Sequence, residues 1–282
     1  MFSRKMLKFA ISVIGVVFAV SICIGLSGSI AMADYGCSND GEFTTDFRLD
    51  KCRFVSWGNN PYFKLWPGYQ LVLEGFEEPE VEGEDGEFIR SVTTVLWDTE
   101  VINLKKEGIG RARTRVVEER EWVSDDGEEW ELKEVSRNFF ARCKQTDAVY
   151  YFGEDVDNYE DGVIDNHDGA WRAGVDGAMP GLIMPGTFLL GSKYFQEIAP
   201  ENDAVDRGEN TEMGVPVETD AGTFENCVVV VDTNPAEGNC GIEEDDEGDV
   251  KIYCPGVGLV MDEELELVDY GFYVFDLDDD EE

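Results

Sequence analysis

The chain has 282 residues, of which 62 are acidic and 22 are basic, so its formal net charge is −40 at pH 7. A surface this negative repels nucleic acid and anionic lipid, which excludes both as partners of the folded domain. Hydrophobic residues still make up 43% of the chain, so the composition predicts a folded core rather than a disordered acidic tail. The spread of acids along the chain favours adaptation to salty surroundings, with binding of divalent cations as the alternative.

The N-terminal segment has the pattern of an export signal. A positive start at residues 4–8 precedes an uncharged apolar run at residues 9–26, and residues 31–33 (Ala-Met-Ala) form a small-x-small cleavage pattern. We therefore predict a signal peptide over residues 1–33 and a periplasmic or secreted protein. The alternative is an uncleaved N-terminal anchor, because the apolar run is just long enough for a marginal membrane span.

After this leader, runs of β-branched and aromatic residues alternate with clusters of Gly, Pro, Asp and Asn, and long helical periodicity is absent. The pattern predicts strands, in chain order, at residues 69–73, 88–97, 111–123, 130–144, 148–153, 192–198, 223–232, 250–253 and 258–261. The strongest hairpin signal is the sequence Ser-Asp-Asp-Gly at residues 124–127, because Asp-Gly favours the positive φ angles of tight turns. Four consecutive valines at residues 228–231 predict a strand covered on both faces.

Residues 162–191 depart from the strand pattern and are rich in Gly and Pro. We expect a long irregular loop here, in which Met179 and Met184 either cover a ligand cavity or plug the open end of a sheet. The predicted fold class is all-β: a single strongly curved antiparallel sheet, a half-barrel or open barrel, closed by this Gly/Pro/Met loop. We expect one domain over residues 34–271 and an acidic C-terminal tail over residues 272–282.

Six cysteines follow the leader, and an even number favours disulfides in an exported chain. They are Cys37, Cys52, Cys143, Cys227, Cys240 and Cys254. The candidate pairs by proximity are Cys37 with Cys52 and Cys240 with Cys254. The other two cysteines either form a third bridge or are free buried thiols. The absence of C-x-x-C and the presence of a single histidine exclude a Cys2His2 zinc site.

Four groups of residues between positions 60 and 260 stand out as motifs. They are Asn60-Pro61-Tyr62-Phe63 with Trp66-Pro67-Gly68, Tyr151-Phe152-Gly153-Glu154-Asp155 with Trp171, Ala178-Met179-Pro180-Gly181 with Met184-Pro185, and Gly222-Thr223-Phe224 with Cys227 leading to Tyr253-Cys254-Pro255-Gly256-Val257-Gly258-Leu259-Val260. Together they resemble a family of uncharacterised exported bacterial proteins. The last motif is also similar to the closing strand of periplasmic lipoprotein-carrier half-barrels. The resemblance implies an exported protein with a wrapped sheet, and it implies no activity.

The sequence DNYEDGVIDNHD, which starts at residue 157, has aspartates at the spacing of an EF-hand calcium loop. Asp157, Asp161, Asp165 and Asp168 would occupy positions 1, 5, 9 and 12 of that loop. These four are the candidate metal ligands, and calcium is the one cofactor considered. Tyr159 stands where another oxygen ligand belongs, so the alternative is a plain β-hairpin turn.

The candidate ligand-binding residues lie on the Gly/Pro/Met segment and on the strand that follows it. They are Trp171, Met179, Met184, Tyr194 and Phe195. Motifs for a nucleophilic serine, a metalloprotease or a phosphate-binding loop are absent after the leader, so no catalytic residue is predicted. The first hypothesis is a non-catalytic exported protein that holds a small apolar ligand or a partner protein segment. The alternatives are a calcium-binding protein and, third, a hydrolase with a carboxylate pair.

Overall fold

The computed structural model describes residues 37, 42–78, 86–241 and 248–273, all of which belong to one compact unit. The predicted signal peptide and nearly all of the predicted acidic tail lie outside the described residues. The helical elements in these ranges include the 3₁₀ turns η2 (Leu49–Lys51), η3 (Pro200–Asn202) and η4 (Pro235–Glu237). In these ranges we find no helix with the length and apolar character that crossing a bilayer requires.

The strands follow one another along the chain with short connections. Their bounds are β1 Phe54–Val55, β2 Asn59–Asn60, β3 Phe63–Lys64, β4 Tyr69–Glu77, β5 Glu87–Leu104, β6 Gly110–Ser124, β7 Glu131–Cys143, β8 Val149–Glu160, β9 Val163–Asn166, β10 Trp171–Arg172, β11 Met179–Met184, β12 Lys193–Phe195, β13 Glu197–Ile198, β14 Arg207–Thr219, β15 Gly222–Thr233, β16 Asp249–Cys254, β17 Gly258–Asp262 and β18 Leu265–Phe272. The long strands β4 to β8 are rich in Val, Phe, Tyr and Thr, which pack well on a pleated surface.

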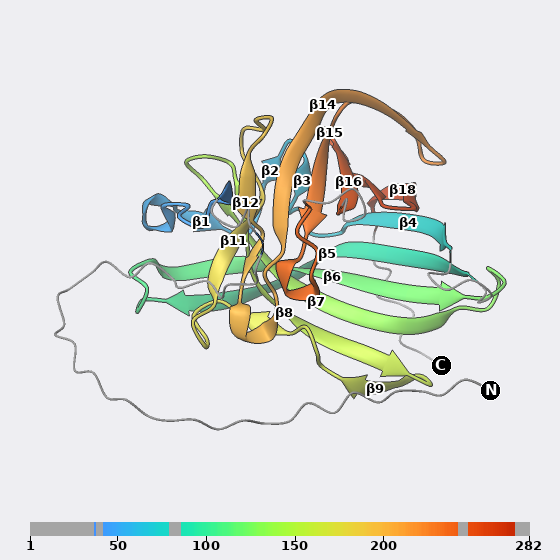
Figure 1. Cartoon of the computed structure of the whole chain (residues 1–282), viewed down its shortest axis with the longest axis horizontal. Helices are drawn as coiled ribbons and strands as arrows, with labels where there is room; N and C mark the ends of the chain where they lie inside the picture. The colour runs from blue at the N-terminus through green and yellow to red at the C-terminus, as the bar shows by residue number, and fades with distance from the viewer. Residues whose placement is uncertain (1–36, 38–41, 79–85, 242–247, 274–282) are drawn as a thin grey trace. The chain divides into compact units, whose positions relative to one another are not determined.

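Sixteen of these strands form one antiparallel sheet, which confirms the predicted fold class. The main path runs β12-β14-β15-β16-β17-β18-β4-β5-β6-β7-β8-β11-β13. Figure 1 shows β4 to β8 as a broad curved layer, with β14 to β16 crossing above it. The sheet is nearly closed into a barrel, and one seam separates the two ends of the path.

The seam lies at Gln196, the single residue between β12 and β13. β12 pairs with β14 at one end of the path, and β13 pairs with β11 at the other. The backbone N–H groups of Gln196 and Glu197 both donate to the carbonyl oxygen of Asp206, at 2.7 Å and 3.2 Å. Gly181 of β11 passes so close that a β-carbon there would overlap the carbonyl oxygen of Gln196. The barrel is therefore drawn together at a position that has no room for a side chain.

Residues 162–191 close the sheet, but they do so through three short strands rather than as the irregular loop expected from their composition. β9, β10 and β11 each pair antiparallel with β8, one after another along its length. The reason is that β8 would otherwise leave a row of unpaired backbone groups at its edge. Gly and Pro are tolerated here because each of the three strands is short and lies next to that edge.

Three disulfides connect the six cysteines: Cys37–Cys240, Cys52–Cys143 and Cys227–Cys254. The predicted pairs Cys37–Cys52 and Cys240–Cys254 were wrong, as was the alternative of free thiols at residues 143 and 227. Proximity in sequence misled because antiparallel pairing brings distant residues together: Cys227 on β15 and Cys254 on β16 have Cα atoms 4.2 Å apart. Three disulfides are typical of proteins in an oxidising, extracytoplasmic environment.

Candidate ligand cavity

The inside of the barrel holds a cavity of about 330 Å³. Its wall follows the two-residue period of strands: Tyr69 and Leu71 on β4, Thr93 and Val95 on β5, Val117 and Glu119 on β6, Asn138 and Phe140 on β7, and Lys251 and Tyr253 on β16. Because alternate side chains of a curved sheet point inward, these strands contribute their inner faces to one shared space.

One part of the wall is apolar and aromatic. Its members are Tyr62, Phe63, Tyr69, Leu71, Val95, Val117, Phe140, Ile183, Val257 and Leu259. Several of these rings are fixed by one another, as when Phe63 and Phe140 meet edge to face with centroids 5.0 Å apart. Tyr69 is also held at its polar end, because its hydroxyl donates to the carbonyl oxygen of Val257 at 2.9 Å. This part of the wall is therefore a preformed apolar surface.

Another part of the wall is acidic, and at its centre are two carboxyl groups that hydrogen-bond to each other, Glu197 and Asp206. Glu197 is 7% exposed. Burial and the neighbouring carboxylates raise the pKa of Glu197 well above its usual range, because both disfavour a negative charge on its side chain. The indole Nε1 of Trp171 donates to Glu197 Oε1 at 3.3 Å and favours the charged form.

Asp232 and Glu119 extend this acidic wall from β15 and β6. Gln196 Nε2 donates to Asp232 Oδ1 at 2.8 Å, and Ser91 Oγ donates to Glu119 Oε1 at 2.6 Å. Burial raises the pKa of Asp232 to about 7, and it raises the pKa of Glu119 as well. Both groups therefore hold their protons to a higher pH than exposed acids do.

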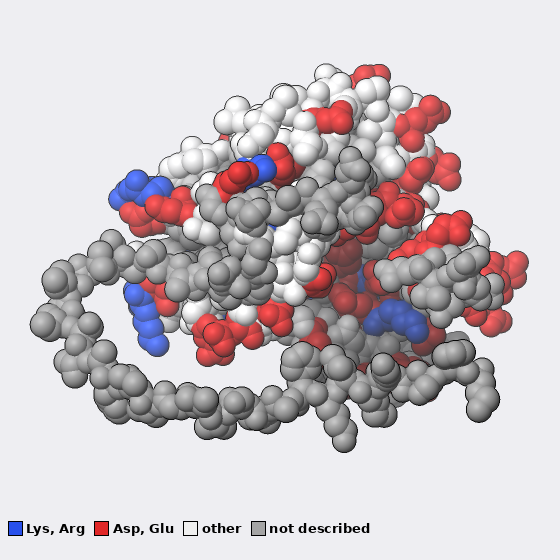
Figure 2. Space-filling view, viewed as in Figure 1, with Lys and Arg blue, Asp and Glu red and all other residues white. Residues whose placement is uncertain are grey.

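Lys251 contributes a positive charge to the same wall. Its Nζ lies 3.0 Å from Asp262 Oδ1. Burial opposes the charged ammonium, but Asp262 and Asp232 outweigh that cost and raise the pKa of Lys251 well above its usual range. In Figure 2 acidic side chains are spread over the visible face, and some lie in the shaded recess to the right of its centre.

The five predicted ligand-binding residues surround the cavity, but none of them is among the described residues that line it. Met184 is fully buried in the main hydrophobic core, while Met179 packs with Phe195 in a smaller cluster. The hydroxyl of Tyr194 donates to Asn210 Oδ1 at 2.9 Å. Trp171 does not line the cavity, but it hydrogen-bonds to Glu197, which does. On β11 the lining residue is Ile183, so the choice of Met184 pointed to the correct strand but to the neighbouring residue, whose side chain is on the opposite face.

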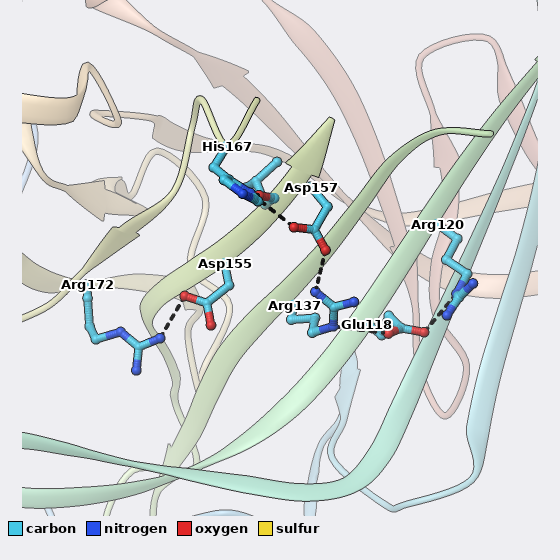
Figure 3. A network of polar contacts seen from close by, with 8 residues as sticks. Glu118, Arg120, Arg137, Asp155, Asp157, His167 and Arg172 are labelled. Atoms are coloured by element: carbon cyan, nitrogen blue, oxygen red, sulfur yellow. Dashed lines mark hydrogen bonds and ion pairs between the residues drawn. The ribbon is translucent and has the colours of Figure 1, made fainter. Parts of the chain in front are cut away.

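Asp157, Asp161 and Asp165 lie on the β8–β9 hairpin, and Asp168 follows β9 by two residues, so this segment forms the β-hairpin of the alternative interpretation. Asp161 and Gly162 form its turn with φ angles of 52° and 75°. Asp157 Oδ2 accepts from Arg137 at 2.9 Å, and its Oδ1 lies 3.0 Å from His167 Nδ1 (Figure 3). Asp165 and Asp168 are exposed.

The structure therefore does not draw these four aspartates together. In the described part of the chain, no group of three or more His, Cys, Asp or Glu residues is arranged to hold a metal ion. Figure 3 shows instead a chain of alternating charges in which Arg137 lies between Asp157 and Glu118, and Glu118 also pairs with Arg120 at 2.8 Å. In this structure, Asp157 therefore pairs with the side chains of Arg137 and His167.

The acids of the cavity wall were not selected as site residues from the sequence, and neither were its tyrosines, Tyr62, Tyr69, Tyr151 and Tyr253. A usable signal did exist in the two-residue spacing, because Val228, Val230 and Asp232 share one face of β15. Glu119 follows Val117 on β6 in the same way. In a chain with 62 acids, however, a carboxylate on a strand does not stand out.

Comparison with known proteins found no match to any protein-family model, any curated protein or any solved structure. The resemblance to exported bacterial proteins and to lipoprotein-carrier half-barrels therefore stays a prediction. What the fold and the cavity define is a class: a disulfide-bonded, nearly closed antiparallel barrel with an amphipathic interior.

Proposed function

We propose that this protein is a non-catalytic binding protein that holds a small molecule with an apolar body inside its barrel, in the periplasm or outside the cell. The observation that carries this proposal is the cavity of about 330 Å³ with its apolar wall of rings and branched side chains. Known ligand sites begin at about 300 Å³ and are mostly apolar with a few polar groups. The volume therefore suits a ligand of one to three rings.

Apolar contact by itself supports only weak binding of so small a ligand. Burying about 150 Å² of an aromatic group is worth about 4 kcal/mol, which corresponds to a dissociation constant near 1 mM before the costs of association. Binding tighter than this requires the polar side of the cavity as well.

A hydrolase with a carboxylate pair is the second candidate, because Glu197 and Asp206 are paired in the cavity and the pKa of Glu197 is raised by burial. Their contact argues against the glycosidase version of that hypothesis. Glycosidase carboxyl groups stand at least about 5 Å apart to leave room for the sugar, whereas these two hydrogen-bond directly. Binding without catalysis is therefore favoured.

The calcium-binding alternative rests on the spacing of Asp157, Asp161, Asp165 and Asp168. It is tested by calorimetric titration of the protein with calcium at moderate salt. Heat of binding together with a rise in melting temperature would support it, and the absence of both would remove it.

A partner protein segment is the remaining alternative occupant of the barrel, and it would have to enter as a short apolar stretch.

The cavity proposal is tested with N-phenyl-1-naphthylamine, an uncharged dye that fluoresces in apolar sites. We expect saturable fluorescence with the native protein and loss of it in Val117→Trp, since Val117 lines the cavity and is 3% exposed. Val163→Trp is the matched control, because Val163 is 65% exposed on β9. Equal dye binding by native protein and Val117→Trp, with both folded by circular dichroism, would reject the cavity as the site.

A further inference from the structure

The cavity wall carries a strong excess of negative groups over positive ones. Six acids line it, namely Glu119, Glu197, Asp206, Asp232, Asp249 and Asp262, against the two cations Lys64 and Lys251. Both cations are engaged within the protein. Lys251 pairs with Asp262 at 3.0 Å, and Lys64 Nζ lies 4.0 Å from the centre of the Tyr69 ring. Lys251 also acts electrostatically on Asp232, so two cations serve six acids and the carboxyl groups of the wall stay in excess.

Tyr253 provides a second and independent observation. It lines the cavity and is 6% exposed. Within the described ranges its hydroxyl has no hydrogen-bond partner. The charged groups that act on it are led by Asp232 and Lys251, so the hydroxyl belongs to the acidic side of the wall. Although the residue is buried as a whole, its hydroxyl is open to the cavity that it lines, so it is free to hydrogen-bond to a group that enters from outside.

We propose that the ligand of this cavity carries a protonated amine, which is held by Asp232, by the Glu197–Asp206 pair and by the Tyr253 hydroxyl oxygen. This inference rests on the proposed function and names the chemical class of its ligand. An ammonium group donates up to three hydrogen bonds, which matches a wall that offers several acceptors at once. Its apolar body would lie against the aromatic wall.

The arrangement of the carboxyl groups supports a single binding site for the ammonium group, which we call the cationic seat. Asp206 acts electrostatically on both Glu197 and Asp232, so the three groups are neighbours rather than separate sites. Gln196, at the seam, hydrogen-bonds to Asp232 and adjoins Glu197, which fixes the positions of both. An anionic ligand would meet repulsion from whichever of these groups is ionised, and a neutral alcohol would gain hydrogen bonds without the charge.

The seat lies in surroundings that strengthen an ion pair. The wall excludes bulk water from one side, and a charge-assisted hydrogen bond is about twice as strong as a neutral one. We therefore expect an amine to bind at least about tenfold more tightly than its neutral isostere.

The test compares three ligands of similar size: 2-phenylethylamine, 2-phenylethanol and 3-phenylpropionate. Each is titrated against the native protein loaded with N-phenyl-1-naphthylamine, and its affinity is read from displacement of the dye. We expect the amine to displace the dye at about tenfold lower concentration than the alcohol, and the carboxylate to displace it least. The double variant Glu197→Gln/Asp232→Asn should abolish the advantage of the amine while keeping the affinity for the alcohol.

The matched control is Glu212→Gln, which removes an exposed charge on β14 and should leave the preference intact. Equal affinities for amine and alcohol would overturn the inference but leave the apolar cavity standing. Failure of the dye itself to bind would overturn both proposals. Displacement of the dye by calcium chloride, equal to that by the amine, would overturn the inference in favour of a metal-ion seat.

Discussion

Trp171 and Glu197 are joined by a hydrogen bond of 3.3 Å between indole Nε1 and carboxyl Oε1, and this bond links β10 to the seam of the barrel. Trp171 is 4% exposed and its ring meets that of Tyr151 edge to face. Trp171 thus supports the acidic wall from behind, without lining the cavity itself. Trp171 was predicted from the sequence to contact the ligand. In the structure it acts on the cavity only through its hydrogen bond to Glu197.

Replacing Trp171 by Phe removes this donor and leaves the buried carboxyl of Glu197 with one partner fewer. We expect the free energy of unfolding to fall by about 2 kcal/mol, because a buried polar group left without its partner keeps its desolvation cost. Urea unfolding measures the change. Trp97→Phe is the matched control, since Trp97 is 74% exposed and should cost less than about 0.5 kcal/mol. Equal losses in the two variants would contradict the structural role of the bond.

Asp232 makes the stability of the protein depend on pH in the direction opposite to that of an ordinary surface acid. Its pKa is raised from 3.8 to about 7 by burial. Folded protein therefore binds a proton at Asp232 that unfolded protein releases, and the stabilisation present below pH 3.8 is lost as the pH rises to about 7. The loss at Asp232 is at most about 4 kcal/mol.

Asp232→Asn mimics the protonated acid and keeps the oxygen that accepts from Gln196. We expect this variant to be more stable than the native protein at pH 8 and to show a flatter dependence of unfolding free energy between pH 5 and pH 8. Glu212→Gln controls for the loss of one negative charge at an exposed site. A native slope retained in Asp232→Asn would show that Asp232 is not the group responsible.

Gly181→Ala should open or distort the seam of the barrel. A β-carbon at residue 181 would overlap the carbonyl oxygen of Gln196, and a backbone atom in a paired strand has little freedom to move away. We expect a loss of about 3 kcal/mol, measured by urea unfolding. Gly177→Ala is the comparison, because Gly177 has open space around it and only its φ of 85° opposes a side chain, at a cost of about 1 kcal/mol. Indistinguishable losses would mean that the seam adapts.

The three disulfides predict a specific peptide map. Proteolysis without reduction, followed by mass spectrometry, should yield linked peptides for Cys37–Cys240, Cys52–Cys143 and Cys227–Cys254. The same digest after reduction should contain none of them. Recovery of a peptide that joins Cys37 to Cys52, or Cys240 to Cys254, would instead support the pairing by proximity and contradict the disulfides of the structure.

Much of the strand pattern was readable from the sequence. The predicted runs at residues 111–123 and 223–232 correspond to β6 and β15, and Gly127 has the positive φ of 74° that the hairpin signal required. β14 and β18 were not predicted, although both belong to the main path of the sheet. β14 contains charged and glycine residues such as Glu212 and Gly214, which hide its apolar period, and β18 is interrupted by acids.

Local composition by itself determined that this chain forms strands joined by tight turns, a hydrophobic core and a very negative exterior, because each of those properties depends on residues that are neighbours in sequence. Tertiary structure alone decided which cysteines pair, where the ends of the sheet meet at Gln196, and which acids enter the cavity. Those outcomes depend on register between distant strands, and a shift of one residue moves every side chain to the opposite face. For that reason Ile183, Asp232 and Tyr253 line the cavity, while Met184 and Tyr194 pack behind its wall.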